Sequence, residues 1–122
     1  MRSMFYKLDK DGVPRTVSME EWAFMFEDVG SRVVKQEHVH DVLVSTVFLG
    51  FDHNYRPDGP PILWETMVFE ENRTNYKRDK ERFPVVERDG YTERCSGNKE
   101  QAEAMHDRVV ALIKEEHAKK NR

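Results

Sequence analysis

The sequence predicts an α+β protein in which an antiparallel sheet of about four to six strands has an N-terminal-half helix and a C-terminal helix packed on it. Runs of β-branched and aromatic residues, separated by turn-forming segments, indicate the strands. Two other segments begin with capping residues and continue with apolar side chains at helical spacing. Because the strand-like runs follow one another through short connections, antiparallel pairing is favoured.

The length and composition predict a single domain over residues 1–122, located in the cytoplasm. A chain of 122 residues is too short for two independent cores. Cys95 is the only cysteine, which excludes an intrachain disulfide and favours a reducing compartment. We expect no signal peptide and no membrane span, because no apolar run approaches the ~20 residues that a span requires. The 20 Lys and Arg nearly balance the 23 Asp and Glu, which argues against nucleic acid as a partner.

The first element expected is a hairpin of Phe5–Leu8 and Val13–Val17. The intervening Asp9–Gly12 segment ends in Asp-Gly, which is a strong signal for a tight turn between strands. A calcium loop would also need a Glu six residues after the Gly, and that position is Ser18. The hairpin is therefore the favoured interpretation.

The first helix is expected to begin after Ser18, which forms a capping box with Glu21. Gly30 is placed to end this helix. One apolar stripe follows the capping box and consists of Trp22, Met25, Phe26 and Val29. We expect the helix to dock through the large side chains Trp22, Met25 and Phe26.

Four segments are predicted to form the main strands. Val33–Val39 has a β-like pattern, and Val42–Phe51 is the most apolar run of the chain and is expected to be the central strand. Ile62–Phe69 and Tyr91–Cys95 follow as further strands. The Pro, Gly, Asp and Asn content of Asp52–Pro61 predicts a loop.

The last helix is expected to begin with a second capping box at residues 98–101 and to run to about Glu116. Residues 117–122 are then a charged, frayed tail. A charged excursion is predicted at residues 70–89. The apolar stripe of the helix consists of Ala102, Met105, Val109, Leu112 and Ile113.

Three segments resemble a family of small uncharacterised proteins, many of them encoded by bacteriophages and prophages. These are Ser45–His53 (STVFLGFDH), Gly59–Phe69 (GPPILWETMVF) and, more loosely, Gln101–His106. The chain departs from the family pattern in having Trp64 where Phe is usual, and in its charged segment at 70–89 where relatives carry a short Gly-rich turn. The resemblance implies a phage-type setting and an antiparallel sheet with a terminal helix, but no reaction.

The histidines allow a metal-site hypothesis. His38 and His40 are two residues apart and project from one face of an extended segment. With His53 and Glu65 they would supply the ligands of a small metal-dependent hydrolase or isomerase. The alternative is that His38 and His40 lie at the tip of a hairpin without a ligand.

The loop residues favour binding over catalysis. His53, Asn54, Tyr55 and Arg56 lie between the two most family-like strands, and Tyr and Arg are enriched at binding hot spots. The sheet face that bears Glu65 is the next candidate surface. In the purely structural interpretation His53 bonds loop carbonyls, Glu65 pairs with an arginine such as Arg94, and His106 is a satisfied core residue.

The leading hypothesis is a non-enzymatic phage-type accessory protein that binds a host protein or a small molecule, such as a defence signal, and needs no cofactor. The metal-dependent enzyme is the alternative. A third hypothesis is a structural protein that forms homo-oligomers by pairing of sheet edges or helices.

Overall fold

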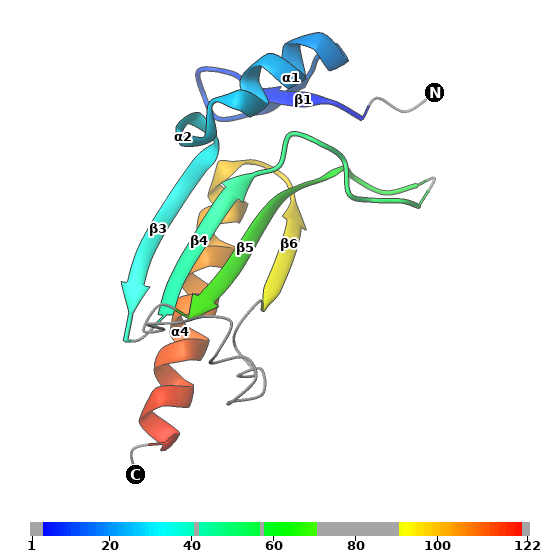
Figure 1. Ribbon diagram of the computed structural model, residues 1–122. Coiled ribbons are helices and arrows are strands. Elements are labelled where there is room, and N and C mark those ends of the chain that lie inside the picture. The colour runs from blue at the N-terminus through cyan, green and yellow to red at the C-terminus, as the bar shows by residue number, and fades with distance from the viewer. Residues whose placement is uncertain (1–3, 41, 57, 71–90, 121–122) are drawn as a thin grey trace, which may run out of the picture.

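A four-stranded antiparallel sheet with one long helix on one face forms the body of the molecule (Figure 1). The computed structural model describes residues 4–40, 42–56, 58–70 and 91–120. The charged excursion expected at 70–89 lies, from residue 71 onward, outside the described residues. The α+β class, with antiparallel sheets, an N-terminal-half helix and a C-terminal helix, is confirmed.

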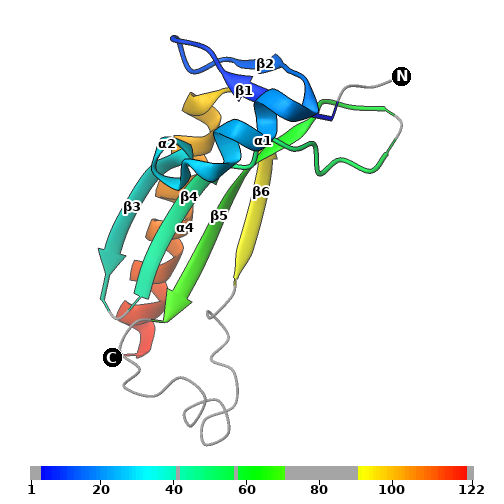
Figure 2. The same cartoon turned by 45° about the horizontal axis from the view of Figure 1, so that its top comes forward.

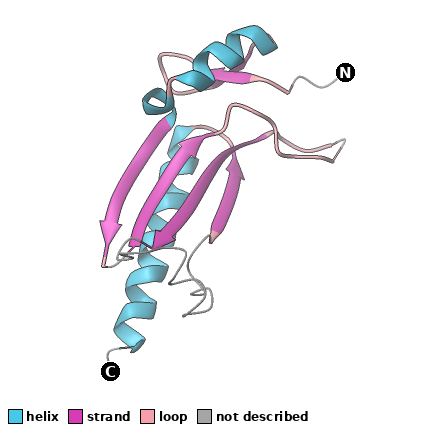
Figure 3. Ribbon diagram, viewed as in Figure 1, coloured by secondary structure: helices cyan, strands magenta, loops and turns pink. Residues whose placement is uncertain are grey.

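The strands lie in the order β3 (Val33–Val39), β4 (Val42–Phe48), β5 (Ile62–Glu70) and β6 (Thr92–Ser96) (Figure 3). Each strand pairs with its neighbour in sequence, and residues 71–91 separate β5 from β6. β4 is one of the two inner strands, in agreement with its apolar composition. It ends at Phe48, three residues before the predicted end.

The C-terminal helix α4 (Lys99–Lys120) begins with the predicted capping box. The Asn98 side chain accepts hydrogen bonds from the amides of Glu100 and Gln101, and the Gln101 side chain accepts one from the Asn98 amide. The helix continues to Lys120 and is therefore longer than the predicted end near Glu116.

The core between the sheet and α4 consists of two apolar clusters. One cluster contains Val39, Val42, Val44, Val68, Val109, Val110 and Ile113. The other contains Phe48, Leu63, Trp64, Ala102 and Met105. Between them in sequence, on β4, β5 and α4, lie Thr46, Thr66 and His106, none of which is exposed. We call these three residues the polar layer.

The N-terminal elements lie across one end of the sheet (Figures 1 and 2). They are the predicted hairpin of β1 (Tyr6–Leu8) and β2 (Pro14–Thr16), followed by α1 (Met19–Glu27) and the short α2 (Val29–Arg32). Backbone bonds join the hairpin to the segment that follows β4: the Tyr6 amide donates to the Gly50 carbonyl. The predicted cap of α1 is present, because the Ser18 hydroxyl accepts a hydrogen bond from the Glu21 amide.

Helix α1 differs from the sequence-based expectation in how it packs and in where it ends. Trp22 and Met25 are only half-buried, Phe26 is 43% exposed, and no described residue of α1 is buried. Trp22 of the apolar stripe packs on the aromatic rings of Phe5 and Phe51 at the end of the sheet. Gly30 lies within α2 and does not end α1, since Asp28 follows α1 and its carboxylate caps α2.

The sheet face opposite α4 carries half-buried apolar side chains from the inner strands, Leu43, Val47 and Met67, and Phe69, which is 41% exposed. It also carries the ion pair of Arg94 with Glu65. Over the described residues, no helix has the length and apolar character needed to cross a membrane.

Gly50 is expected to tolerate no side chain. Its φ is +70°, and an added Cβ would lie 2.7 Å from Trp22 Nε1 and 2.9 Å from Met25 Cε. We expect Gly50→Ala to lower the free energy of unfolding by about 1–3 kcal/mol in chemical denaturation. Gly30→Ala is the matched control, because its nearest contact would be 3.6 Å away. Equal effects of the two substitutions would contradict this packing of α1 on the segment after β4.

Candidate functional site

The loop between β4 and β5 is closed by a buried carboxylate. Asp52 is 2% exposed, and its Oδ1 accepts hydrogen bonds from the amides of Asn54 at 2.8 Å and Ile62 at 3.0 Å. The His53 amide donates to the Ile62 carbonyl at 2.9 Å, next to these bonds. The two ends of the loop are therefore joined at its base by side-chain and backbone bonds.

Asn54 holds the loop from within. Its side-chain amide donates to the carbonyls of Asp58 at 3.2 Å and Pro60 at 2.9 Å, and its Oδ1 accepts a bond from the Arg56 amide at 3.0 Å. Both hydrogens of the amide nitrogen are thus used within the loop. Asn54, predicted as a binding residue, holds the shape of the loop through these bonds.

The side chains that the loop presents are those of His53, Tyr55 and Arg56. Tyr55 is 81% exposed, Arg56 is exposed and His53 is half-buried. The Nδ1 hydrogen of His53 is donated to the Phe51 carbonyl at 2.8 Å, because a carbonyl can only accept, so in the neutral ring Nε2 carries the lone pair. A surface cavity of about 600 Å³ is lined by His53, Asn54, Tyr55, Arg56, Asp58, Gly59, Pro60 and Ile62.

Aromatic rings continue from the loop to α1. The ring centroids of Tyr55 and His53 are 6.4 Å apart, those of His53 and Phe51 5.6 Å, and those of Phe51 and Trp22 6.2 Å. Phe51 and Trp22 are neighbours of the loop that the sequence did not predict. They belong to the end of one strand and to a helix stripe, and only the tertiary contact between these segments makes them neighbours of the site.

Glu65 does not join the loop. It lies on β5, where its Oε2 accepts a hydrogen bond from Arg94 Nε at 2.9 Å. Glu65 pairs with Arg94, as the structural interpretation expected, whereas His53 bonds the carbonyl of Phe51, the residue just before the loop. A His53 base oriented by Glu65 is therefore not formed.

The histidines of the metal-site hypothesis are also separated. His40 lies at the turn after β3, at the end of the sheet opposite the loop, and its ring stacks on His117 with centroids 3.5 Å apart. His38 is exposed on β3, opposite Leu43 of β4. The prediction that His38, His40, His53 and Glu65 form one site is wrong, because the strands carry them to different ends and faces of the sheet.

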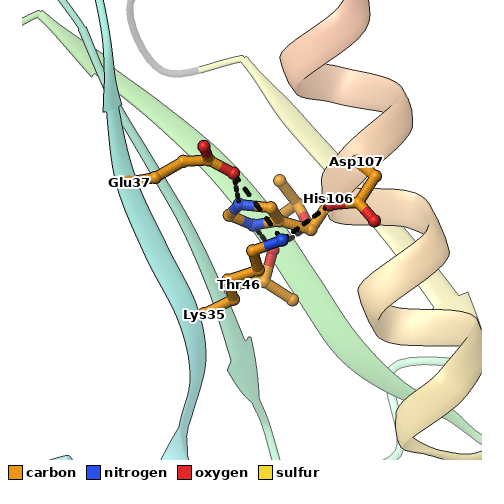
Figure 4. Close-up of polar contacts among 6 residues, drawn as sticks. Lys35, Glu37, Thr46, His106 and Asp107 are labelled. Atoms are coloured by element: carbon orange, nitrogen blue, oxygen red, sulfur yellow. Dashed lines mark hydrogen bonds and ion pairs between the residues drawn. The ribbon is translucent and has the colours of Figure 1, made fainter.

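His106 has hydrogen-bond partners at both ring nitrogens (Figure 4). Its Nδ1 lies 2.7 Å from the Thr46 hydroxyl, which in turn lies 2.5 Å from the Thr66 hydroxyl. Its Nε2 lies 2.9 Å from Oε1 of Glu37 on β3. The expectation that His106 is a core residue bonded to a strand is confirmed.

Glu37, His106 and Thr46 are connected in the order carboxylate, imidazole and hydroxyl, as in a hydrolytic triad. A nucleophile must reach its substrate, however, and Thr46 has no exposed surface. Cys95 is also a poor nucleophile, because burial raises the pKa of its thiol and so disfavours the thiolate. The arrangement around Thr46 is therefore suited to hold α4 on the sheet.

No protein-family model, curated protein or solved structure significantly matches the chain. The resemblance to phage-encoded proteins described above therefore stays an expectation, and a function has to be argued from the residues themselves.

The polar layer predicts unequal effects of two similar substitutions. Thr46→Val leaves Nδ1 of the buried His106 without its partner, and we expect a loss of about 1–3 kcal/mol of unfolding free energy. Thr66→Val leaves the bond between Thr46 and His106 intact, so we expect a smaller loss. Chemical denaturation measures both, and a Thr66→Val variant that is less stable than Thr46→Val would contradict this role of Thr46.

Proposed function

We propose that the chain is a non-enzymatic accessory protein of the phage type, which acts in the host cytoplasm by binding a host protein or a small molecule through residues 52–61. The observation that carries the proposal is that some residues of this loop hold its shape while others project into solvent. Asp52 and Asn54 hold its shape, while Tyr55 is 81% exposed and lines the cavity.

The internal bonds lower the cost of binding. A flexible loop loses conformational freedom when it meets a partner, and that loss reduces its affinity. The bonds from Asp52 and Asn54 restrict this loop before any partner arrives. Exposed Tyr and Arg side chains on a restricted backbone are typical of binding hot spots.

The side chains also restrict the chemistry of the partner. Arg56 offers several N–H donors, so its partner should supply a carboxylate, a phosphate or another acceptor. Tyr55 and the half-buried ring of His53 offer flat apolar surface beside it. A ligand with an acidic group next to an apolar or aromatic group fits both, whether it is part of a host protein or a small acidic signal molecule.

The geometry gives less support to catalysis. The predicted histidine set is not assembled, and the one carboxylate–imidazole–hydroxyl arrangement noted above has its hydroxyl buried. The binding hypothesis needs only exposed side chains on a restricted loop, and these are present.

The test is a double substitution, Tyr55→Ala with Arg56→Ala. We expect the thermal midpoint to stay close to that of the parent, because neither side chain is buried. Affinity for the partner should fall by about thirtyfold or more, which corresponds to ~2 kcal/mol at a hot spot. Partners would be sought by quantitative capture from a bacterial lysate and by thermal-shift screening of acidic metabolites and nucleotides.

The matched control is Phe24→Ala with Lys10→Ala, which also removes an exposed aromatic ring and an exposed cation, but away from the loop. A genuine partner is retained by the parent and by this control and is lost from the loop variant. If the loop variant binds every partner as tightly as the parent, the loop is only a connector and the proposal fails.

A further inference from the structure

We propose that Glu37, His106 and Asp107 form a Zn²⁺ site in which the ammonium group of Lys35 holds the place of the ion. We call these four residues the Glu37 site (Figure 4). The proposal is independent of the loop, since the site lies between β3 and the middle of α4. Among the described residues, Glu37, His106 and Asp107 are the one group of three or more whose donor atoms are close enough to share a metal ion.

The donor atoms are of the right kind and nearly at the right spacing. His106 offers an imidazole nitrogen, and Glu37 and Asp107 each offer a carboxylate oxygen, all within 4.8 Å of one another. Ligands on a tetrahedral zinc ion lie ~2.0–2.2 Å from the metal and therefore about 3.4 Å from each other. The exposed Asp107 side chain can make the remaining shift of up to about 1.4 Å by a change of rotamer.

The polar layer orients His106 as a metal ligand requires. A ligating imidazole usually donates its second N–H to a neighbouring group, which fixes the ring and its tautomer. Here the Nδ1 hydrogen would go to the Thr46 hydroxyl, leaving the Nε2 lone pair directed at the carboxylates. In the absence of a metal, Nε2 donates to Glu37 and Thr46 donates to Nδ1. Because either Thr hydroxyl can be the donor in their mutual bond, the pair accommodates both tautomers.

Lys35 indicates that the site stabilises a cation. Its Nζ lies 2.9 Å from Asp107 Oδ1 and 3.9 Å from Glu37 Oε1. Glu103 adds a further negative charge near Lys35. A divalent ion would balance the two carboxylates that one ammonium group neutralises only in part.

An entry path is present. A surface cavity of about 300 Å³ is lined by Lys35, Glu37, Asp107, Val110, Ala111 and Lys114. The Lys35 side chain is 44% exposed, so it can leave the carboxylates for solvent without disturbing the core. With three protein ligands, water would complete the coordination of the ion.

Zinc is the ion that the donor set favours. An imidazole nitrogen binds Zn²⁺ well, whereas Mg²⁺ and Ca²⁺ prefer sites made only of oxygen. Lys35 competes with the ion for the two carboxylates, so the parent protein should bind zinc weakly. Removal of the ammonium group should therefore reveal the site.

The experiment is a zinc titration of tag-free protein against a chromophoric chelator. We expect Lys35→Met to bind zinc at least tenfold more tightly than the parent, because the competing cation is gone. Adding Asp107→Asn to Lys35→Met should weaken binding at least tenfold. Both positions are exposed, and thermal denaturation checks that the variants fold. Nitrogen NMR should show Nε2 of His106 shifting with zinc while Nδ1 carries the proton.

His40 and His117 provide the matched control, since their stacked rings could also attract zinc at the far end of the sheet. In the Lys35→Met background, His40→Gln with His117→Gln should change zinc affinity by less than twofold. The proposal is overturned if Lys35→Met binds no more tightly than the parent, if Asp107→Asn has no effect, or if the paired histidine variant abolishes binding.

Discussion

The fold depends on a single buried imidazole whose two nitrogens must both find partners. An unpaired polar atom in a core costs about 1–3 kcal/mol, and His106 avoids this cost only where Thr46 and Glu37 are both within reach. Apolar contacts on either side of the polar layer are non-directional and would tolerate small shifts of α4 along the sheet. The hydrogen bonds are directional, so they specify one position of the helix on the strands.

The same contacts connect the core with the proposed metal chemistry. Glu37 is a half-buried residue of β3, so its carboxylate meets His106 on one side and Lys35 near the surface on the other. An ion bound there would be coordinated by the His106 ring, which already holds the helix in place. The loop that we propose for binding lies at the end of the sheet, beside the N-terminal hairpin, where no residue of the polar layer contributes.

Local patterns predicted most of the secondary structure. The β-branched run of β4, the Asp-Gly turn and both capping segments act over a few residues, and each is present in the structure. The Glu37 site was predicted only in part. His106 was expected in the core, but its partner Glu37 is 69 residues away in sequence. Nothing in the sequence around Glu37 distinguishes this half-buried residue from the exposed glutamates of the chain. The stripe of α1 was recognised, but periodicity does not reveal which surface a stripe meets.

The internal bracing of residues 52–61 has an evolutionary consequence. Asp52 and Asn54 determine the backbone path, whereas Tyr55 and Arg56 project from it without supporting it. Substitutions at Tyr55 and Arg56 therefore meet little selection from folding, while those at Asp52 and Asn54 are constrained. If the loop binds a host partner as we propose, a lineage that meets a changing host could exchange the contact residues repeatedly and keep the same scaffold, so its recognition properties would diverge faster than its fold.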